Sequence, residues 1–230
     1  SDVCSSDLKI TRRRFLKVGA VGFSLVATGR SASGEGSGFG SLDLLGLKQI
    51  GSVQSRKSVS IAESSLSVGF EVLDRQCFDP TRTYKHLAEL GVKWARCQTG
   101  WCRCEKERGK YDFAWLDEVV DSLLSIGVQP WFNLGYGNKL YTPDAPDENA
   151  VGWAPVYDDS AFQAWLRFVQ ALAEHFSSRV KHWEIWNEPN AQSFWKPKKG
   201  DVAGYVRLVA ETAPVLRKAV PGATIIGIAC

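Results

Sequence analysis

The segment HWEIWNEPN, residues 182–190, carries the residue types of a proton-transfer site. Its apolar stretch runs into Asn187 and Glu188, so an amide and a carboxyl group follow an expected strand directly. We expect Trp186, and Trp195 beyond it, to flank this carboxyl group and to remove it partly from water, which would disfavour its charged form. A carboxylic acid that stays protonated near neutral pH can give its proton to a leaving oxygen. Glu188 is therefore the candidate general acid, with Asn187 as a hydrogen-bonding partner beside it.

Apolar stretches alternate with helical periodicity from residue 66 onward. We expect strands at 66–73, 92–97, 128–134, 180–186 and 223–228, and helices at 79–91, 112–126, 160–176 and 202–220. This alternation predicts βαβ units and a parallel α/β sheet. A doubly wound sheet and a closed barrel both fit the pattern. No Gly-x-Gly-x-x-Gly loop follows the first expected strand, which weakens the doubly wound, dinucleotide-binding alternative.

The WNEPN motif comes at the end of the fourth expected strand, on the face where parallel barrels carry their active sites. Here the chain resembles the large clan of retaining (β/α)₈ glycoside hydrolases, and most of all its β-xylosidase-like members. The resemblance covers about residues 66–230. It implies that Glu188 is the acid/base and that Asn187 binds the sugar 2-hydroxyl. It also implies that Arg96 supports the nucleophile, with a structural ion pair as the other role for this residue.

Further candidates for sugar binding lie at or after the ends of the first, third and fourth expected strands. Trp131, Asn133 and Tyr136 belong to the segment PWFNLGYG and are expected to line the site, together with Trp195. Trp131 could equally fill the barrel interior, because aromatic side chains often pack there. Glu71 and Asp74 are candidate partners for sugar hydroxyls.

The resemblance implies a nucleophilic Glu at the end of a seventh strand, which this sequence does not reach. A whole barrel takes about 250 residues, whereas about 165 follow residue 65. We therefore expect the front part of a (β/α)₈ barrel, inactive and poorly soluble by itself. The expected function is retaining hydrolysis of β-linked oligo- or polysaccharides. A non-catalytic carbohydrate-binding barrel is the alternative, and an exported oxidoreductase is a third option that lacks a cofactor motif.

Residues 11–17, Thr-Arg-Arg-Arg-Phe-Leu-Lys, match the twin-arginine export motif at every position. A short apolar stretch and small residues follow, as in a signal peptide. We expect residues 1–33 to be a twin-arginine signal, with residues 2–8 as a non-native addition, and 34–65 to be a Gly/Ser-rich linker. The expected location is periplasmic or extracellular, reached through the twin-arginine export machinery. The apolar stretch is shorter than the roughly 20 residues of a membrane anchor.

Charge and cysteine content argue against two other classes of protein. Residues 1–33 hold six of the 28 basic and two of the 25 acidic side chains, so the remainder has a net charge of −1. This lacks the basic excess of a nucleic-acid-binding protein. The spacing of Cys97, Cys102 and Cys104 is not typical of structural zinc, so we expect no metal and no cofactor. A disulfide and buried thiols both remain open for this group.

Overall fold

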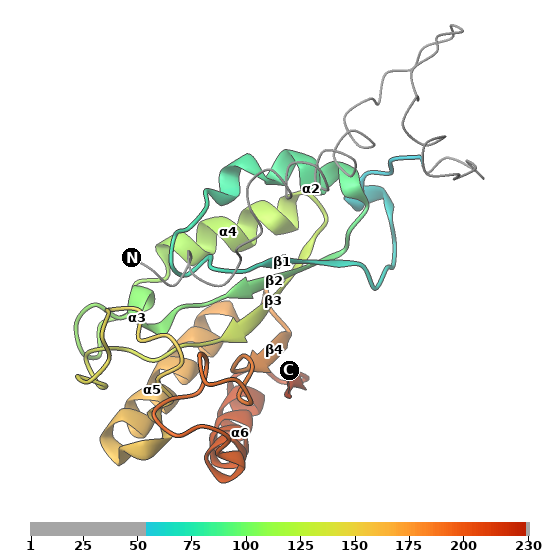
Figure 1. Ribbon diagram of the computed structural model, residues 1–230. Helices are drawn as coiled ribbons and strands as arrows, with labels where there is room; N and C mark the ends of the chain where they lie inside the picture. Colours follow the sequence, from blue (N-terminus) through green and yellow to red (C-terminus); the bar gives the residue numbers. More distant parts are fainter. Residues whose placement is uncertain (1–53, 229–230) are drawn as a thin grey trace, which may run out of the picture. The chain divides into compact units, whose positions relative to one another are not determined.

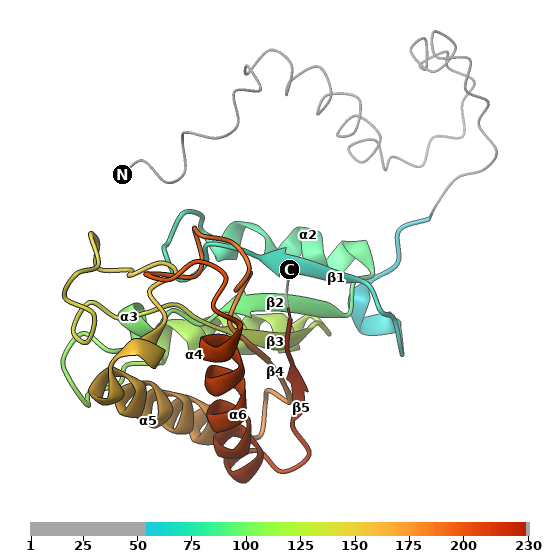
Figure 2. The same ribbon diagram turned by 60° about the horizontal axis from the view of Figure 1, so that its bottom comes forward.

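A five-stranded parallel sheet forms the centre of the structure, a computed structural model in which residues 54–228 are described. The strands are β1 (Ser67–Phe70), β2 (Trp94–Gln98), β3 (Gln129–Leu134), β4 (His182–Ile185) and β5 (Thr224–Ile226). They lie in chain order, and every neighbouring pair is parallel (Figures 1 and 2). A doubly wound sheet reverses its strand order at a switch point. The uninterrupted strand order therefore identifies the sheet as part of a (β/α)₈ barrel and excludes the doubly wound alternative.

The expected helices follow the strands, with shorter bounds at most ends. They are α2 (Tyr84–Leu90), α4 (Ala114–Ser125), α5 (Asp159–Phe176) and α6 (Val202–Ala219). Asp79 caps the 3-10 turn η3 (Pro80–Arg82) ahead of α2, and Gly91 ends α2 in the left-handed conformation that glycine favours. Short elements were not expected from the sequence: η2 (Ser58–Ser60), α3 (Trp101–Cys104) and η4 (Pro155–Tyr157). Within residues 54–228, no helix combines the length and hydropathy needed to cross a bilayer.

The two faces of the sheet differ in chemistry because strand side chains alternate. On the face that packs against the helices, the central strands contribute apolar residues that are completely buried: Ala95, Cys97, Phe132, Leu134, Trp183 and Ile185. The opposite face carries polar and aromatic side chains at paired register positions: Arg96, Gln98, Trp131, Asn133 and Glu184. In a closed barrel this second face is the interior. Its polarity predicts that it binds a polar ligand near the strand ends.

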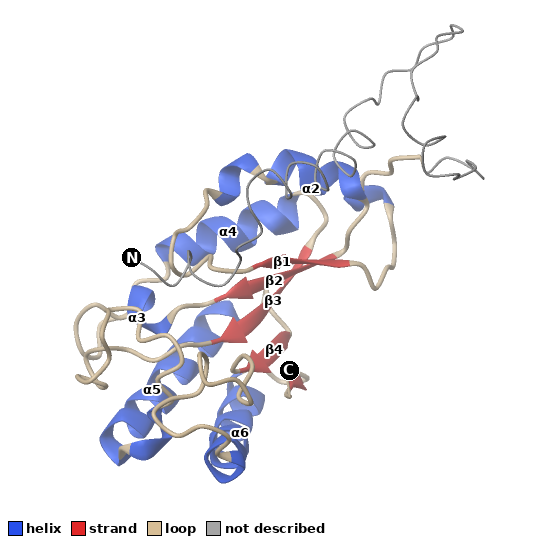
Figure 3. Cartoon of the chain, in the orientation of Figure 1, coloured by secondary structure: helices blue, strands red, loops and turns tan. Residues whose placement is uncertain are grey.

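Loops that follow the strands gather at the end of the sheet to which the arrowheads of β2 and β3 point (Figures 1 and 3). The β3–α5 loop and the β4–α6 loop meet in an isolated bridge between Trp153 and Lys196. Lys196 donates its backbone N–H to the carbonyl of Gly152 at 2.7 Å. Two segments far apart in the sequence are thus tied together over the carboxyl end of the sheet.

The end of the expected linker is folded, which corrects the boundary drawn from composition. Ser58 is completely buried, and its hydroxyl donates to the carbonyl of Leu87 in α2 at 2.8 Å. Lys93 donates to the carbonyl of Ser58 at 3.1 Å, and Trp94 donates to that of Ser64 at 3.0 Å. These contacts attach residues 54–65 to the barrel. The expected signal, residues 1–33, and residues 34–53 lie outside the described part of the chain.

Candidate active site

The WNEPN segment leaves β4 through two residues with left-handed backbone conformations. Trp186 has a φ of 70° and Glu188 has a φ of 43°. Such a conformation costs about 1–3 kcal/mol for a residue with a side chain, so surrounding contacts must hold it. Trp186 is completely buried, its backbone N–H donates to Leu134 at 3.0 Å, and its indole N–H donates to Phe194 at 2.6 Å. The strained turn holds Asn187 and Glu188 at the carboxyl end of the sheet.

Arg96 connects three elements at this end of the sheet. Its Nη1 donates to Oε1 of Glu71 at 2.7 Å, and its Nη2 donates to Oδ1 of Asn187 at 2.8 Å. Its Nε donates to Oε2 of Glu184 at 2.7 Å, and its Nη2 lies 2.6 Å from the same oxygen. A guanidinium holds its donors in one rigid plane, so these partners are fixed relative to one another. Arg96 therefore forms a structural ion pair with Glu184 and also contacts Asn187 of the predicted site.

Glu184 is a buried carboxylate at the base of this network. Only 3% of the residue is exposed, and its Oε2 also accepts a 2.8 Å bond from Nδ2 of Asn133. Burial raises the pKa of Glu184 above its ordinary value, although the adjacent Arg96 acts in the opposite direction. Burial in turn lowers the pKa of Arg96, but Glu184 and Glu71 outweigh it and raise that pKa. Glu184 and Arg96 form an ion pair inside the barrel.

Sequence reasoning did not select Glu184, although a signal for it was present. A lone carboxylate two residues before an expected strand end, within HWEIW, is unusual in a buried strand. Its register partner is Asn133, which was predicted to line the site. Asn133 also donates to the backbone carbonyl of Trp186 at 2.7 Å. It is fully buried and links β3 to the strained turn after β4.

Trp131 lies on the inner face of the sheet beside Arg96. The centre of its ring is 5.7 Å from the guanidinium carbon, within the range of a cation–π contact. Its indole N–H donates to the hydroxyl of Ser67 at 3.2 Å. The residue is partly exposed, between the buried Phe132 and the exposed Gln129. This position is compatible with its predicted contact to a sugar.

Tyr136 and Trp195 occupy positions behind this surface. Trp195 is completely buried, its indole N–H donates to Oη of Tyr157 at 2.7 Å, and its ring packs edge-on against Trp186. The structure thus corrects the prediction that Trp195 contacts substrate, because the ring supports the strained turn from within the core. Tyr136 is 1% exposed and stacks on Phe194. Its hydroxyl is buried without a hydrogen-bond partner among the described residues.

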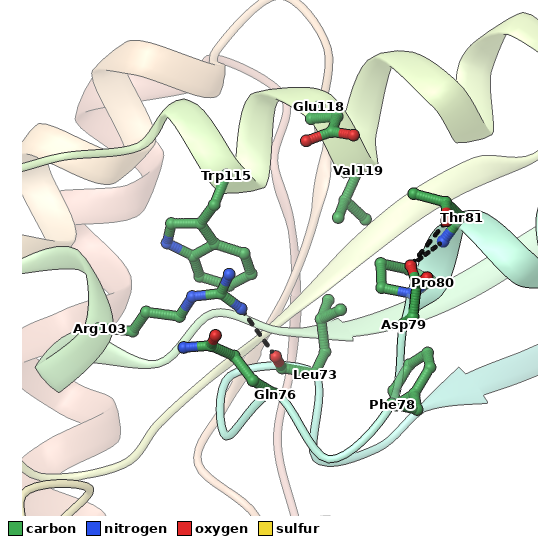
Figure 4. A pocket seen from close by; sticks show the side chains of 10 residues that line it. All are labelled: Leu73, Gln76, Phe78, Asp79, Pro80, Thr81, Arg103, Trp115, Glu118 and Val119. Carbon is green, nitrogen blue, oxygen red and sulfur yellow. Dashed lines mark hydrogen bonds between the residues drawn. The ribbon is translucent and has the colours of Figure 1, made fainter.

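A separate pocket of about 410 Å³ opens beside the β1–α2 loop (Figure 4). Leu73 and Phe78 line it from the loop, and Trp115 lines it from α4. Arg103 lies 3.7 Å from the ring centre of Trp115 and donates to the carbonyl of Leu73 at 3.0 Å. None of the predicted site residues lines this pocket. Its contacts brace the loop that carries Glu71.

The cysteine group consists of buried thiols. Cys97, Cys102 and Cys104 are all unoxidised, and no disulfide occurs among the described residues. Burial raises the pKa of Cys102 to about 12 and raises the pKa values of Cys97 and Cys104 as well. Between residues 54 and 228, no three His, Cys, Asp or Glu side chains are grouped so that they could hold a metal ion.

Comparison with known proteins gives this site a family. Residues 78–229 match the family described as glycosyl hydrolases family 39. A β-xylosidase of Geobacillus stearothermophilus is 29% identical over 119 residues, which are 48% of this chain and 23% of the relative. Beta-glucosidase 1B of Phanerodontia chrysosporium is 29% identical over 109 residues, 45% of this chain and 19% of that protein.

Solved structures show the same fold. A family 39 glycoside hydrolase from Bacteroides cellulosilyticus WH2 superposes with a TM-score of 0.55 at 22% identity, over 70% of this chain and 30% of that one. A β-glucosidase from Thermotoga maritima in complex with deoxynojirimycin gives 0.52 at 20% identity, over 66% and 37%. The chain thus spans well under half the length of each of these proteins. Since the family match extends over well more than half of its residues, the chain belongs to glycosyl hydrolase family 39.

Proposed function

We propose that this chain supplies the acid/base part of the active site of a retaining β-glycosidase. Glu188 protonates the glycosidic oxygen as the bond breaks and later removes a proton from the attacking water. Asn187 binds the sugar hydroxyl beside the reacting carbon. The observation that carries the proposal is the position of Glu188: it follows β4 at the carboxyl end of a parallel barrel sheet, next to an Asn anchored by Arg96.

The second carboxylate of a retaining mechanism lies about 5 Å from the first and acts as the nucleophile. We propose that it is a Glu outside these 230 residues, at the end of a seventh barrel strand. Arg96, Glu184 and Asn133 form the interior layer beneath the reacting groups. On this proposal, hydrolysis requires the full-length protein.

The test is hydrolysis of aryl β-xylosides and β-glucosides by the full-length protein. Glu188→Gln removes the proton and preserves the shape of the side chain. We expect activity to fall by about 1,000-fold on substrates with poor leaving groups, and far less on those whose leaving group departs without a proton. Glu89→Gln, on the exposed surface of α2, is the matched control and should leave both rates unchanged.

Three outcomes would contradict the proposal. Equal loss of activity on all leaving groups would argue against proton donation by Glu188. Inversion at the anomeric carbon, followed by NMR of the first product, would exclude the retaining mechanism. A protein that binds oligosaccharides and hydrolyses none of them would instead be a non-catalytic carbohydrate-binding barrel.

We also propose that the protein is exported by the twin-arginine route to the periplasm or beyond. The motif at residues 11–17 supports this. Changing both Arg12 and Arg13 to Lys should leave the precursor in the cytoplasm, as measured by fractionation and N-terminal sequencing of the mature protein. Unchanged export of this variant would overturn the proposed route.

A further inference from the structure

Glu71 is an exposed carboxylate that the structure nevertheless holds in one position. Its side chain is 52% exposed, and both of its oxygens accept hydrogen bonds. Oε1 accepts from Nη1 of Arg96 at 2.7 Å, and Oε2 accepts from Nε2 of Gln98 at 3.0 Å. A solvated Glu usually samples many rotamers, so fixing this one costs conformational entropy. The two contacts fix the orientation of its carboxylate.

The donors that hold Glu71 are themselves fixed. Arg96 is paired with the buried Glu184. The Oε1 of Gln98 accepts from the backbone N–H of Val72 at 2.8 Å and from Nη2 of Arg75 at 2.9 Å. Because each donor is held from behind, the carboxylate is organised before any ligand arrives.

Gly69 makes room for this orientation. A Cβ atom at position 69 would lie only 2.8 Å from Oε1 of Glu71 and 3.4 Å from its Cγ. The side chain of Glu71 therefore folds back over Gly69, whose register partner is Arg96 on the inner face of the sheet. Any larger residue at position 69 would push the carboxylate away.

Glu71 and Asn187 are held by the same guanidinium group. Nη1 of Arg96 contacts Glu71 and Nη2 contacts Asn187, so the two acceptors lie side by side at the rim of the site. Each oxygen of an ionised carboxylate has two lone-pair positions. Glu71 uses one on each oxygen for protein contacts, and the others remain available to hydroxyl donors.

The charges around Glu71 favour a ligand without a negative charge. The two guanidinium groups that contact Glu71 or its partner Gln98 are already in contact with carboxylates: Arg96 with Glu71 and Glu184, and Arg75 with Asp74. An anionic sugar would meet Glu71 at close range with neither of these cations spare to compensate. Like charges brought together in this way act against the wrong ligand.

We propose that Glu71 is a specificity-determining residue that binds hydroxyl groups of a neutral sugar unit and excludes sugar acids. The inference rests on the proposed glycosidase function and names its substrate class: β-glycosides of neutral sugars. Glu71 acts by direct contact with the sugar, and Gly69, Arg96 and Gln98 position it.

The test compares neutral and acidic substrates of the full-length protein: 4-nitrophenyl β-xyloside, β-glucoside and β-glucuronide. We expect the wild type to prefer its best neutral substrate over the glucuronide by at least about 100-fold in kcat/KM. Glu71→Gln should lower kcat/KM on the neutral substrate by about 10- to 100-fold, because a hydroxyl loses a charged acceptor. The ratio of kcat/KM on the neutral substrate to kcat/KM on the glucuronide should therefore fall by at least about tenfold in this variant.

One further variant separates the position of the Glu71 carboxylate from its charge, and a second variant is a control. Gly69→Ala retains the charge and displaces Glu71, so we expect a loss on neutral substrates similar to that of Glu71→Gln. Glu63→Gln, an exposed residue before β1, is the control and should behave as the wild type. Thermal denaturation checks that each variant is folded. If a variant is not folded, the inhibition constants of xylose, glucose and glucuronic acid on the wild-type protein give the neutral-over-acidic preference as a binding ratio.

The outcomes distinguish this inference from the function on which it rests. If Glu188→Gln shows the leaving-group dependence expected of a general acid but Glu71→Gln keeps the wild-type rate and the wild-type preference, the role of Glu71 is overturned and the glycosidase function stands. The role of Glu71 is also overturned if the wild-type protein hydrolyses the glucuronide as readily as the neutral substrates. If the wild type hydrolyses none of the glycosides, both proposals fail together.

Discussion

Nη2 of Arg96 donates a 2.8 Å hydrogen bond to Oδ1 of Asn187. Arginine has no acceptor, so this contact fixes which end of the Asn187 amide faces the guanidinium. The NH₂ group of Asn187 must point the other way. The amide is therefore presented as a hydrogen-bond donor at the site, in an orientation that Glu184 and Glu71 stabilise through Arg96.

This orientation predicts the effect of replacing the Asn187 amide. Asn187→Asp keeps an acceptor for Arg96 and removes the NH₂ donor. We expect kcat/KM to fall by about 100-fold on glycosides that carry a 2-hydroxyl, because a bond that strengthens in the transition state is lost. On the corresponding 2-deoxyglycosides the variant and the wild type should differ by less than about threefold. An equal loss on both substrates would show that Asn187 acts only through the fold.

The ion pair beneath the site predicts a stability difference between two variants of Glu184. Glu184→Ala removes the acceptor that Arg96 and Asn133 share and leaves Arg96 partly uncompensated. The free energy of unfolding of the full-length protein should fall by about 3 kcal/mol, as when one partner of a buried pair is deleted. Glu184→Gln retains a carbonyl acceptor of the same size and should cost clearly less. Urea denaturation measures both, and equal losses would argue against a role for the acceptor.

Much of the fold follows from the sequence because its determinants are local. The apolar strand segments, the Asp79 cap and the Gly91 helix end are each set by a few neighbouring residues. The barrel assignment needed the fourth strand end, and the observed strand order agrees with it. The position of Glu188 after β4 was likewise evident from the WNEPN motif.

What the sequence did not reveal depends on contacts between distant segments. Trp195 is buried because the β4–α6 loop folds back over the core, a tertiary contact invisible in local pattern. The positive φ of Trp186 is stabilised by contacts with β3 and residue 194, which no propensity encodes. Residues 54–65 were assigned to a linker from their Ser content, although Ser58 is buried against α2. The Glu184–Arg96 pair likewise joins residues 88 positions apart.

The buried cysteines predict slow thiol chemistry. Burial raises the pKa of Cys102 to about 12, and Cys97 and Cys104 are also held in the neutral thiol form. Since the thiolate is the reactive species, all three should resist alkylation at pH 8 in the folded protein and react within minutes in denaturant. Peptide mapping after iodoacetamide treatment identifies each site. Rapid labelling of Cys104 in the native protein would contradict its buried position.

An ion pair joins α4 to the C-terminal end of α5 and the residues that follow it. Asp117 of α4 accepts a 2.8 Å bond from Nε2 of His175 in α5 and also pairs with Arg179. Burial opposes the charge of Asp117, but the bonds from His175 and Arg179 outweigh it and lower the pKa of Asp117 below its ordinary value. A carboxyl group with a lowered pKa stabilises the fold above its unfolded pKa of about 4 and loses this contribution as the pH falls below that value.

Asp117→Asn removes the titrating group, so the melting temperature of the variant should depend less on pH below about pH 4 than that of the wild type. At pH 7 the variant should melt at a lower temperature than the wild type, and the difference should shrink steadily between about pH 4 and pH 2. Glu118→Gln, the next residue on α4, is the control and should leave this pH dependence unchanged. Thermal denaturation of the full-length protein across this range decides the matter. If the difference between Asp117→Asn and wild type is the same at pH 7 and pH 2, the charge of Asp117 does not hold α4 against α5.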